Sequence, residues 1–167
     1  MPQLKHLDRE ELFRQAETIH EGYVAGLNCA ERVFLTVHAV VETDIPPEAV
    51  ALLSGLGGGV GGTREGVCGA VSGGVAAIGL VHGRPNPPAG NRERAYEVSR
   101  DFVCQFRTAF GTTVCRELIG DLLREGTAEA EEQRKARCCQ YTLKAIRSCI
   151  ETLIRFEQPR PPASLPK

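Results

Sequence analysis

The chain has 167 residues, 42% of them hydrophobic and 25% charged, which suits a single globular domain with a core of its own. Its 20 basic and 21 acidic residues give a net charge of −1, so nucleic acid is not an expected partner. The most apolar uncharged run, residues 67–81, is shorter than the ~17–25 residues of a membrane helix, so no membrane insertion is expected. The N-terminus lacks the apolar region of a secretory signal, and we therefore expect a cytoplasmic protein.

The first two helices have recognisable start signals. Apolar residues recur at helical spacing after Asp8, which together with Glu11 resembles a capping box, and Gly26 is expected to end this helix. Asn28 is a natural N-cap for the second helix. Cys29 would then occupy the first helical position.

Glycine and proline shape the middle of the chain. Residues 45–56 predict a third helix with prolines in its opening turn. The segment GGGVGGTREG, residues 57–66, then interrupts all regular structure. A helix of small apolar residues follows over residues 68–81, and we expect it to be buried. A proline-rich loop leads from it into the second half of the chain.

The second half predicts three more helices. They cover residues 92–110, a short segment capped by Thr112 or Thr113, and residues 128–156, which carry a clear apolar stripe. No strand alternation is present. The prediction is an all-α protein: a compact bundle of about five to six helices with a glycine-rich loop before a buried central helix. Residues 1–157 would form one cysteine-rich domain, and the proline-rich tail 158–167 would be disordered.

Seven cysteines are many for a chain of this length, and an odd number without a secretion signal argues against structural disulfides. Catalytic, redox or metal-binding thiols are the better expectation. Cys29, Cys68 and Cys115 each lie in the predicted first turn of a helix. Free N–H groups and the positive end of the helix dipole lower the pKa of a thiol there, which suits a nucleophile, a redox thiol or a metal ligand.

The remaining cysteines are less clearly placed. Cys138 and Cys139 are adjacent and diverge by about 100° on a helix, so periodicity does not choose between them. Cys104 and Cys149 lie in the middle of predicted helices, where a cysteine more often acts as a small hydrophobic side chain.

Several glycines and arginines are further candidates for a site. Gly69 and Gly73 lie four residues apart and give the small-residue helix a bare face, which either a cofactor, another helix or a second copy of the chain could approach. With Gly66 they are the candidate cofactor-binding residues. Arg64 and Arg116 could stabilise thiolates or an anionic cluster, or face solvent.

Four separate segments resemble the C_GCAxxG_C_C family of redox-active proteins, which carries four characteristic cysteines. CGAVSGG resembles its CGAxxG motif, and LNCAERVF, FRTAFGTTVCRELIG and CCQYTLKA resemble its other three cysteine segments in order. The resemblance covers residues 12–155 and implies cysteine chemistry without fixing a reaction. It selects Cys29, Cys68, Cys115 and Cys138, with Cys139 in reserve because the doublet departs from the pattern.

Three hypotheses follow for these four thiols. The first is an electron-transfer protein whose four cysteines ligate an iron–sulfur cluster. The second is a metal-free thiol oxidoreductase in which Cys68 attacks and Cys29 or Cys115 resolves the disulfide. The third is a structural zinc site. The redox partner is not identifiable from the sequence, and both an oxidoreductase and an electron carrier remain open.

Overall fold

The computed structural model describes residues 2–23, 26–88 and 92–157, and within them it is predominantly helical. The all-α class predicted from the sequence is confirmed. The tail 158–167, expected to be disordered, lies outside the described residues. The helices are α1 (Arg9–Gly22), α2 (Cys29–His38), the 3-10 helix η1 (Pro47–Leu56), α3 (Gly69–His82), α4 (Arg92–Phe110), α5 (Cys115–Glu125) and α6 (Ala128–Glu157).

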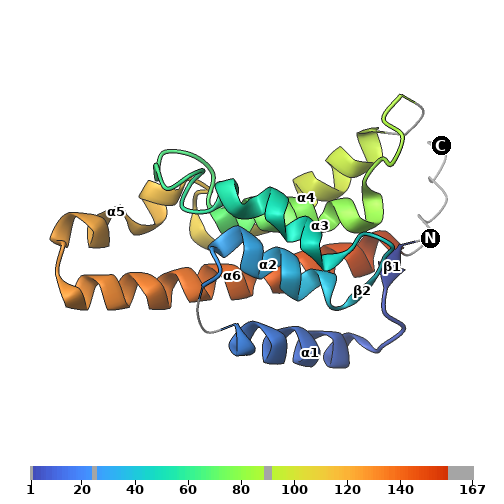
Figure 1. Ribbon diagram of the computed structural model, residues 1–167, viewed down its shortest axis with the longest axis horizontal. Coiled ribbons are helices and arrows are strands. Elements are labelled where there is room, and N and C mark those ends of the chain that lie inside the picture. Colours follow the sequence, from blue (N-terminus) through green and yellow to red (C-terminus); the bar gives the residue numbers. More distant parts are fainter. Residues whose placement is uncertain (1, 24–25, 89–91, 158–167) are drawn as a thin grey trace, which may run out of the picture.

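The long helix α6 organises the bundle. It runs along the longest axis of the molecule and contacts each of the other five α-helices (Figure 1). Helix α1 lies along one side of α6, whereas α3 and α4 lie on the other, and α5 folds back over the N-terminal part of α6 (Figure 1). The most extensive helix pair is α2 with α3.

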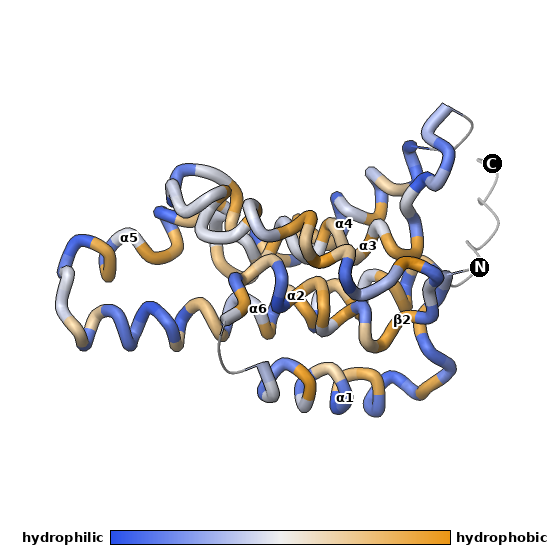
Figure 2. The backbone as a smooth tube through the Cα atoms, viewed as in Figure 1, coloured by the Kyte–Doolittle hydropathy of each residue, from blue (hydrophilic) through white to orange (hydrophobic). Residues whose placement is uncertain are grey.

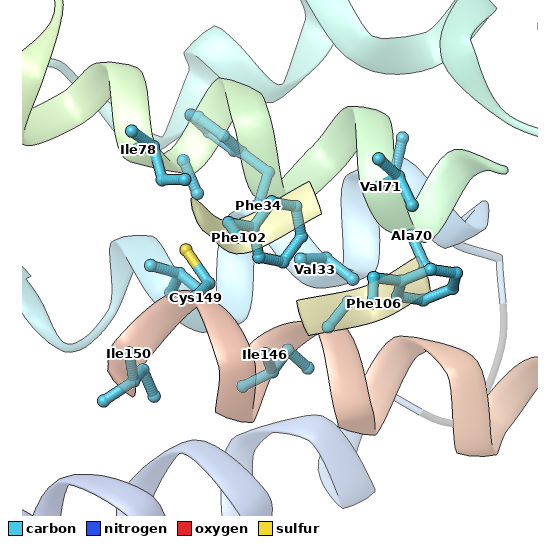
Figure 3. Close-up of a cluster of buried hydrophobic side chains, with 14 of the residues drawn as sticks. Val33, Phe34, Ala70, Val71, Ile78, Phe102, Phe106, Ile146, Cys149 and Ile150 are labelled. Atoms are coloured by element: carbon cyan, nitrogen blue, oxygen red, sulfur yellow. The ribbon is translucent and has the colours of Figure 1, made fainter. Parts of the chain in front are cut away.

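The core lies between α2, α3, α4 and α6. Phe102 and Phe106 of α4 and Ile146 of α6 are fully buried there, and Figure 3 shows them gathered with side chains of α2 and α3. Cys149 is also fully buried, with its thiol 3.7 Å from the Gly74 carbonyl oxygen, so it acts as a small core residue as expected. Apolar residues concentrate on α3, whereas the first turns of α6 are hydrophilic (Figure 2).

The capping signals explain where the first helices begin. The Asn28 side chain accepts hydrogen bonds from the N–H groups of Ala30 and Glu31, and the Glu31 carboxylate accepts one from the Asn28 N–H, which completes a capping box. Asp8 accepts a hydrogen bond from the Glu11 N–H at the start of α1. Both caps were predicted. Cys29 is therefore the first residue of α2.

The helix expected over residues 45–56, with proline at its start, is present over Pro47–Leu56 as a 3-10 helix. Other local predictions were wrong. Helix α5 has Val114 as its N-cap, without a side-chain hydrogen bond, where Thr112 or Thr113 was expected. Two short strands, β1 (Gln3–Leu4) and β2 (Val41–Glu42), pair in antiparallel fashion. None of the described helices is long and apolar enough to cross a membrane.

Candidate functional site

Four cysteines lie in one neighbourhood, where α2, α3 and α5 begin beside α6. Cys29 opens α2, Cys68 is the N-cap of α3, Cys115 opens α5, and Cys138 lies in the N-terminal half of α6. Each thiol is close enough to at least one other for its charge to change that neighbour's pKa. The structure therefore gathers the four cysteines selected by the family resemblance.

Cys104 and Cys149 lie apart from this group, and Cys139 lies at its edge, where it lines a pocket together with Cys29 and Cys138. Cys149 is in the core, and Cys104 and Cys139 are exposed. Exposure of Cys104 differs from the core role expected for a mid-helix cysteine. Of the adjacent pair on α6, Cys138 packs against the core and contacts Cys29, whereas Cys139 faces outward. The helix thus distinguishes two cysteines that the sequence pattern left equivalent.

Backbone pairing holds two of the thiols side by side. The residues preceding α3 and α5 form an isolated antiparallel bridge between Val67 and Val114. The Cys68 N–H donates to the Thr113 carbonyl at 2.7 Å, and the Cys115 N–H donates to the Gly66 carbonyl at 3.0 Å. This pairing replaces the side-chain cap expected for α5 and fixes Cys68 beside Cys115.

The glycine-rich loop, residues 57–66, folds against this pair. Gly59 has φ +63°, and a Cβ built on it would lie 2.6 Å from the Cβ of Cys115, so only glycine fits there. Arg64 also has a left-handed backbone, with φ 66°, and its guanidinium donates a hydrogen bond to the Cys115 thiol. A strained backbone that brings a cation to a thiol is typical of a functional site.

Gly69 and Gly73 of α3 allow the close approach of α2. A Cβ on Gly73 would lie 2.4 Å from the Ala30 carbonyl oxygen, so its bare face is filled by α2 instead of being open to a cofactor. A Cβ on Gly69 would lie 3.0 Å from the Cβ of Cys29, which places Gly69 at the edge of the thiol group. Gly66 carries the carbonyl that holds Cys115.

Cys29 and Cys138 form a hydrogen-bonded thiol pair. The hydrogen bond with Cys138, reinforced by burial, raises the pKa of Cys29, which therefore keeps its proton. The same bond is the largest of the effects that lower the pKa of Cys138 to about 7; the nearby guanidinium groups of Arg134 and Arg64 also lower it, and burial acts in the opposite direction. At neutral pH Cys138 thus has substantial thiolate character.

Burial dominates at Cys68 and Cys115. It raises the pKa of Cys68 to about 11, although the N–H groups of Ala70 and Val71 donate hydrogen bonds that act in the opposite direction. Burial also raises the pKa of Cys115, against the effect of Arg64. The lowered pKa expected at these helix N-termini is therefore not found, because desolvation of a thiolate outweighs the terminal N–H groups.

Arg134 is a site residue that the sequence analysis missed. It pairs with Glu131 at 2.5 Å, donates a hydrogen bond to Cys138, and its side chain is only 19% exposed. Its position one helical turn before Cys138 was the available signal, since residues four apart share a helix face. Arg116, which had been considered, instead points toward Glu65 at 3.8 Å on the surface.

Over the described part of the chain, no three His, Cys, Asp or Glu side chains form a group arranged to hold a metal ion. In chemical terms the site offers four soft sulfur donors, one of them with thiolate character, next to two arginines.

Comparison with known proteins agrees with this site. Searches of curated proteins and of solved structures gave no match. A family model described as "Putative redox-active protein (C_GCAxxG_C_C)" matches residues 27–152, a span that contains all four gathered cysteines and covers well over half of the chain. The chain therefore belongs to the C_GCAxxG_C_C family.

Proposed function

We propose that the protein is an electron carrier whose centre is an iron–sulfur cluster held by Cys29, Cys68, Cys115 and Cys138. The observation that carries this proposal is the gathering of four thiols from four helices into one neighbourhood. Membership of a family described by redox activity and four cysteines supports it. When bound, such a cluster would take up and release one electron at a time.

The four thiols are suitable ligands for the positively charged core of an iron–sulfur cluster. The hydrogen bond with Cys138 and burial raise the pKa of Cys29, burial raises that of Cys68, and negative charge on neighbouring thiols raises both further, so the metal-free site resists the loss of all four protons. Iron ions would relieve that repulsion, since metal binding and thiol deprotonation are coupled.

The surrounding residues would tune and protect the centre. Cys68 and Cys115 are only 5% and 6% exposed, so their sulfur atoms are largely shielded from water. The N–H groups of Ala70 and Val71 would donate hydrogen bonds to the Cys68 sulfur. Arg64 and Arg134 would balance negative charge on the centre. Hydrogen bonds, net charge and solvent exposure are the features through which a protein sets a cluster potential.

A second candidate function rests on the Cys29–Cys138 contact. Two thiols that already share a hydrogen bond could form a disulfide, with the Cys138 thiolate as attacking group. Cys138 would attack one sulfur of a partner disulfide and release one thiolate. Cys29 would then attack Cys138 in the mixed disulfide and release the second. The chain would lose two electrons and two protons, and the partner disulfide would gain them as two thiols.

The experiment that separates these functions is elemental analysis with visible spectroscopy on protein purified without oxygen. For the cluster we expect brown protein, iron and sulfide in equal amounts, and absorbance that dithionite bleaches. Cys68→Ser should lose iron and colour, whereas Cys104→Ser, an exposed cysteine outside the site, should retain both.

Other outcomes have clear meanings. Colourless protein that reversibly loses two free thiols, in a way abolished by Cys138→Ser and not by Cys68→Ser, would replace the cluster with the dithiol. Bound zinc without reversible thiol chemistry would contradict both functions. Full iron content and colour in Cys68→Ser would contradict the ligand set.

A further inference from the structure

A pocket of about 380 Å³ opens beside the Cys29–Cys138 pair, and both of these cysteines line it. Helices α2 and α6 supply most of its wall, and the two residues before α2 and the glycine-rich loop supply the rest. Its volume lies within the usual range of small-molecule sites. The pocket therefore gives a small ligand direct access to the two thiols that contact each other.

The charge of the pocket is strongly biased. Its lining contains four cations, Arg32, Arg64, Arg134 and Lys135, and no carboxylate. Glu131, which lies outside the lining, pairs with Arg134 at 2.5 Å and approaches Lys135 at 3.9 Å. Within the described residues neither Arg32 nor Arg64 forms an ion pair with a carboxylate. Glu131 is therefore the one described carboxylate that pairs with any of these four cations.

Stabilisation of thiolates accounts for only two of the four cations in the pocket lining. Arg64 and Arg134 donate hydrogen bonds to Cys115 and Cys138 and so have partners inside the site. Arg32, on α2, and Lys135, on α6, are not among the main causes of the pKa shifts of the four thiols, yet both line the same concave surface. Cations from facing elements around a cavity create a field that favours an anion with more than one charge.

We propose that this pocket binds a small dianion, an oxyanion or a dicarboxylate, against the Cys29–Cys138 pair. Arg32 and Lys135 would select it, and Arg64 and Arg134 would link its charge to the thiols. The binding itself can be measured without turnover. Only the role of the anion as the reactant of this centre rests on the proposed function.

The test is isothermal titration calorimetry on the protein as purified, with sulfate and succinate as probes and ionic strength held constant with chloride. We expect saturable 1:1 binding of at least one probe and none of succinamide, the uncharged analogue of succinate. Arg32→Gln and Lys135→Gln should each weaken binding about tenfold, which corresponds to about 1.4 kcal/mol, since each removes a charge-assisted hydrogen bond to the anion. Arg100→Gln, an exposed arginine of α4, is the matched control and should bind like the original protein.

The two probes identify the class of anion. Saturation by sulfate alone assigns an oxyanion, and saturation by succinate alone assigns a dicarboxylate. Absence of saturable binding by either, or equal affinity in Arg32→Gln, Lys135→Gln and Arg100→Gln, would overturn the anion site. Thermal melting of each variant would show whether it remains folded, and Lys135→Gln alters an exposed side chain if Arg32→Gln does not fold.

This result is separable from the proposed function. Protein that keeps its iron or its reversible thiol chemistry but binds neither probe would retain the redox function and lose the anion site. Protein without iron or reversible thiol chemistry that still binds sulfate or succinate through Arg32 would retain the anion site alone.

Discussion

The thiol of Cys29 donates a hydrogen bond to Cys138, so the first residue of α2 meets α6 through two sulfur atoms. The bond makes the two thiols unequal, because the pKa of Cys29 rises while that of Cys138 falls to about 7. Arg134 and Arg64 favour the same assignment of charge. These effects favour Cys138 over Cys29 as the thiolate of the reduced, metal-free pair.

Replacing Cys29 with alanine should raise the pKa of Cys138. Alkylation requires the thiolate, so its rate at Cys138 increases with pH through the pKa of this thiol. In reduced protein freed of metal, the rate should be half-maximal near pH 7, and in Cys29→Ala this midpoint should move to higher pH. Mass spectrometry of iodoacetamide-treated protein across a pH series measures it.

Cys104→Ala is the control for this experiment, since Cys104 is exposed and lies outside the site. An unchanged Cys138 midpoint in Cys29→Ala would mean that the arginines alone hold the thiolate. Cys29 would then have no electrostatic role.

Part of the site could be predicted from the sequence and part could not. Local capping chemistry placed Cys29 at the start of α2, because Asn28 and Glu31 act within a few residues. The raised pKa values of Cys68 and Cys115 depend on burial by distant segments, which no local pattern reports. Arg134 escaped notice for a similar reason, since an arginine among charged residues resembles a solvated helix face.

Gly73→Ala should destabilise the protein by about 1–3 kcal/mol, the typical penalty for overpacking a core. The added Cβ would lie 2.4 Å from the Ala30 carbonyl oxygen, so α2 and α3 would have to separate. Gly79→Ala is the matched control in the same helix, because a Cβ there meets nothing within 4 Å. That change should stabilise the helix by about 0.5–1 kcal/mol.

Urea denaturation of the two glycine variants measures both effects. Equal stability of Gly73→Ala and Gly79→Ala would contradict the close approach of α2 to α3. That outcome would also mean that the helix face with Gly69 and Gly73 is accessible to a cofactor.

Val60→Gly should stabilise the protein by roughly 0.5–1 kcal/mol. Val60 has φ 66°, a left-handed conformation that costs a β-branched residue about 1–2 kcal/mol, and glycine recovers that strain at a smaller entropic cost. Its side chain is 46% exposed, so little packing is lost. An upward shift of the urea midpoint with an unchanged slope is expected, and a downward shift would show that the valine side chain anchors the loop.

Part of the fold, like part of the site, could be predicted from the sequence, and part could not. Long amphipathic segments such as residues 128–156 show enough turns for their period to be read, and α6 matches this range within one residue at its C-terminal end. Strands of two residues, as in β1 and β2, contain no period to detect. The start of α5 is set by pairing between Val67 and Val114, residues far apart in the sequence, so capping rules could not locate it.

Protein stability should fall as the pH drops below about 6.5, because the folded structure lowers the pKa of two histidines. Burial lowers the pKa of His20, which is 3% exposed and hydrogen-bonded to Thr142, and burial likewise lowers the pKa of His82. Below the pKa of an unfolded histidine, about 6.5, the unfolded chain binds protons that the folded chain does not. The free energy of unfolding therefore decreases with falling pH until the folded pKa is reached, by at most about 1.4 kcal/mol per pH unit for each histidine.

Urea denaturation between pH 8 and 5 measures this dependence. It should be weaker in His20→Gln, whose amide can form a hydrogen bond with Thr142 without titrating, and weaker still when His82→Gln is added. A full slope in the double variant would assign the acid sensitivity to other groups.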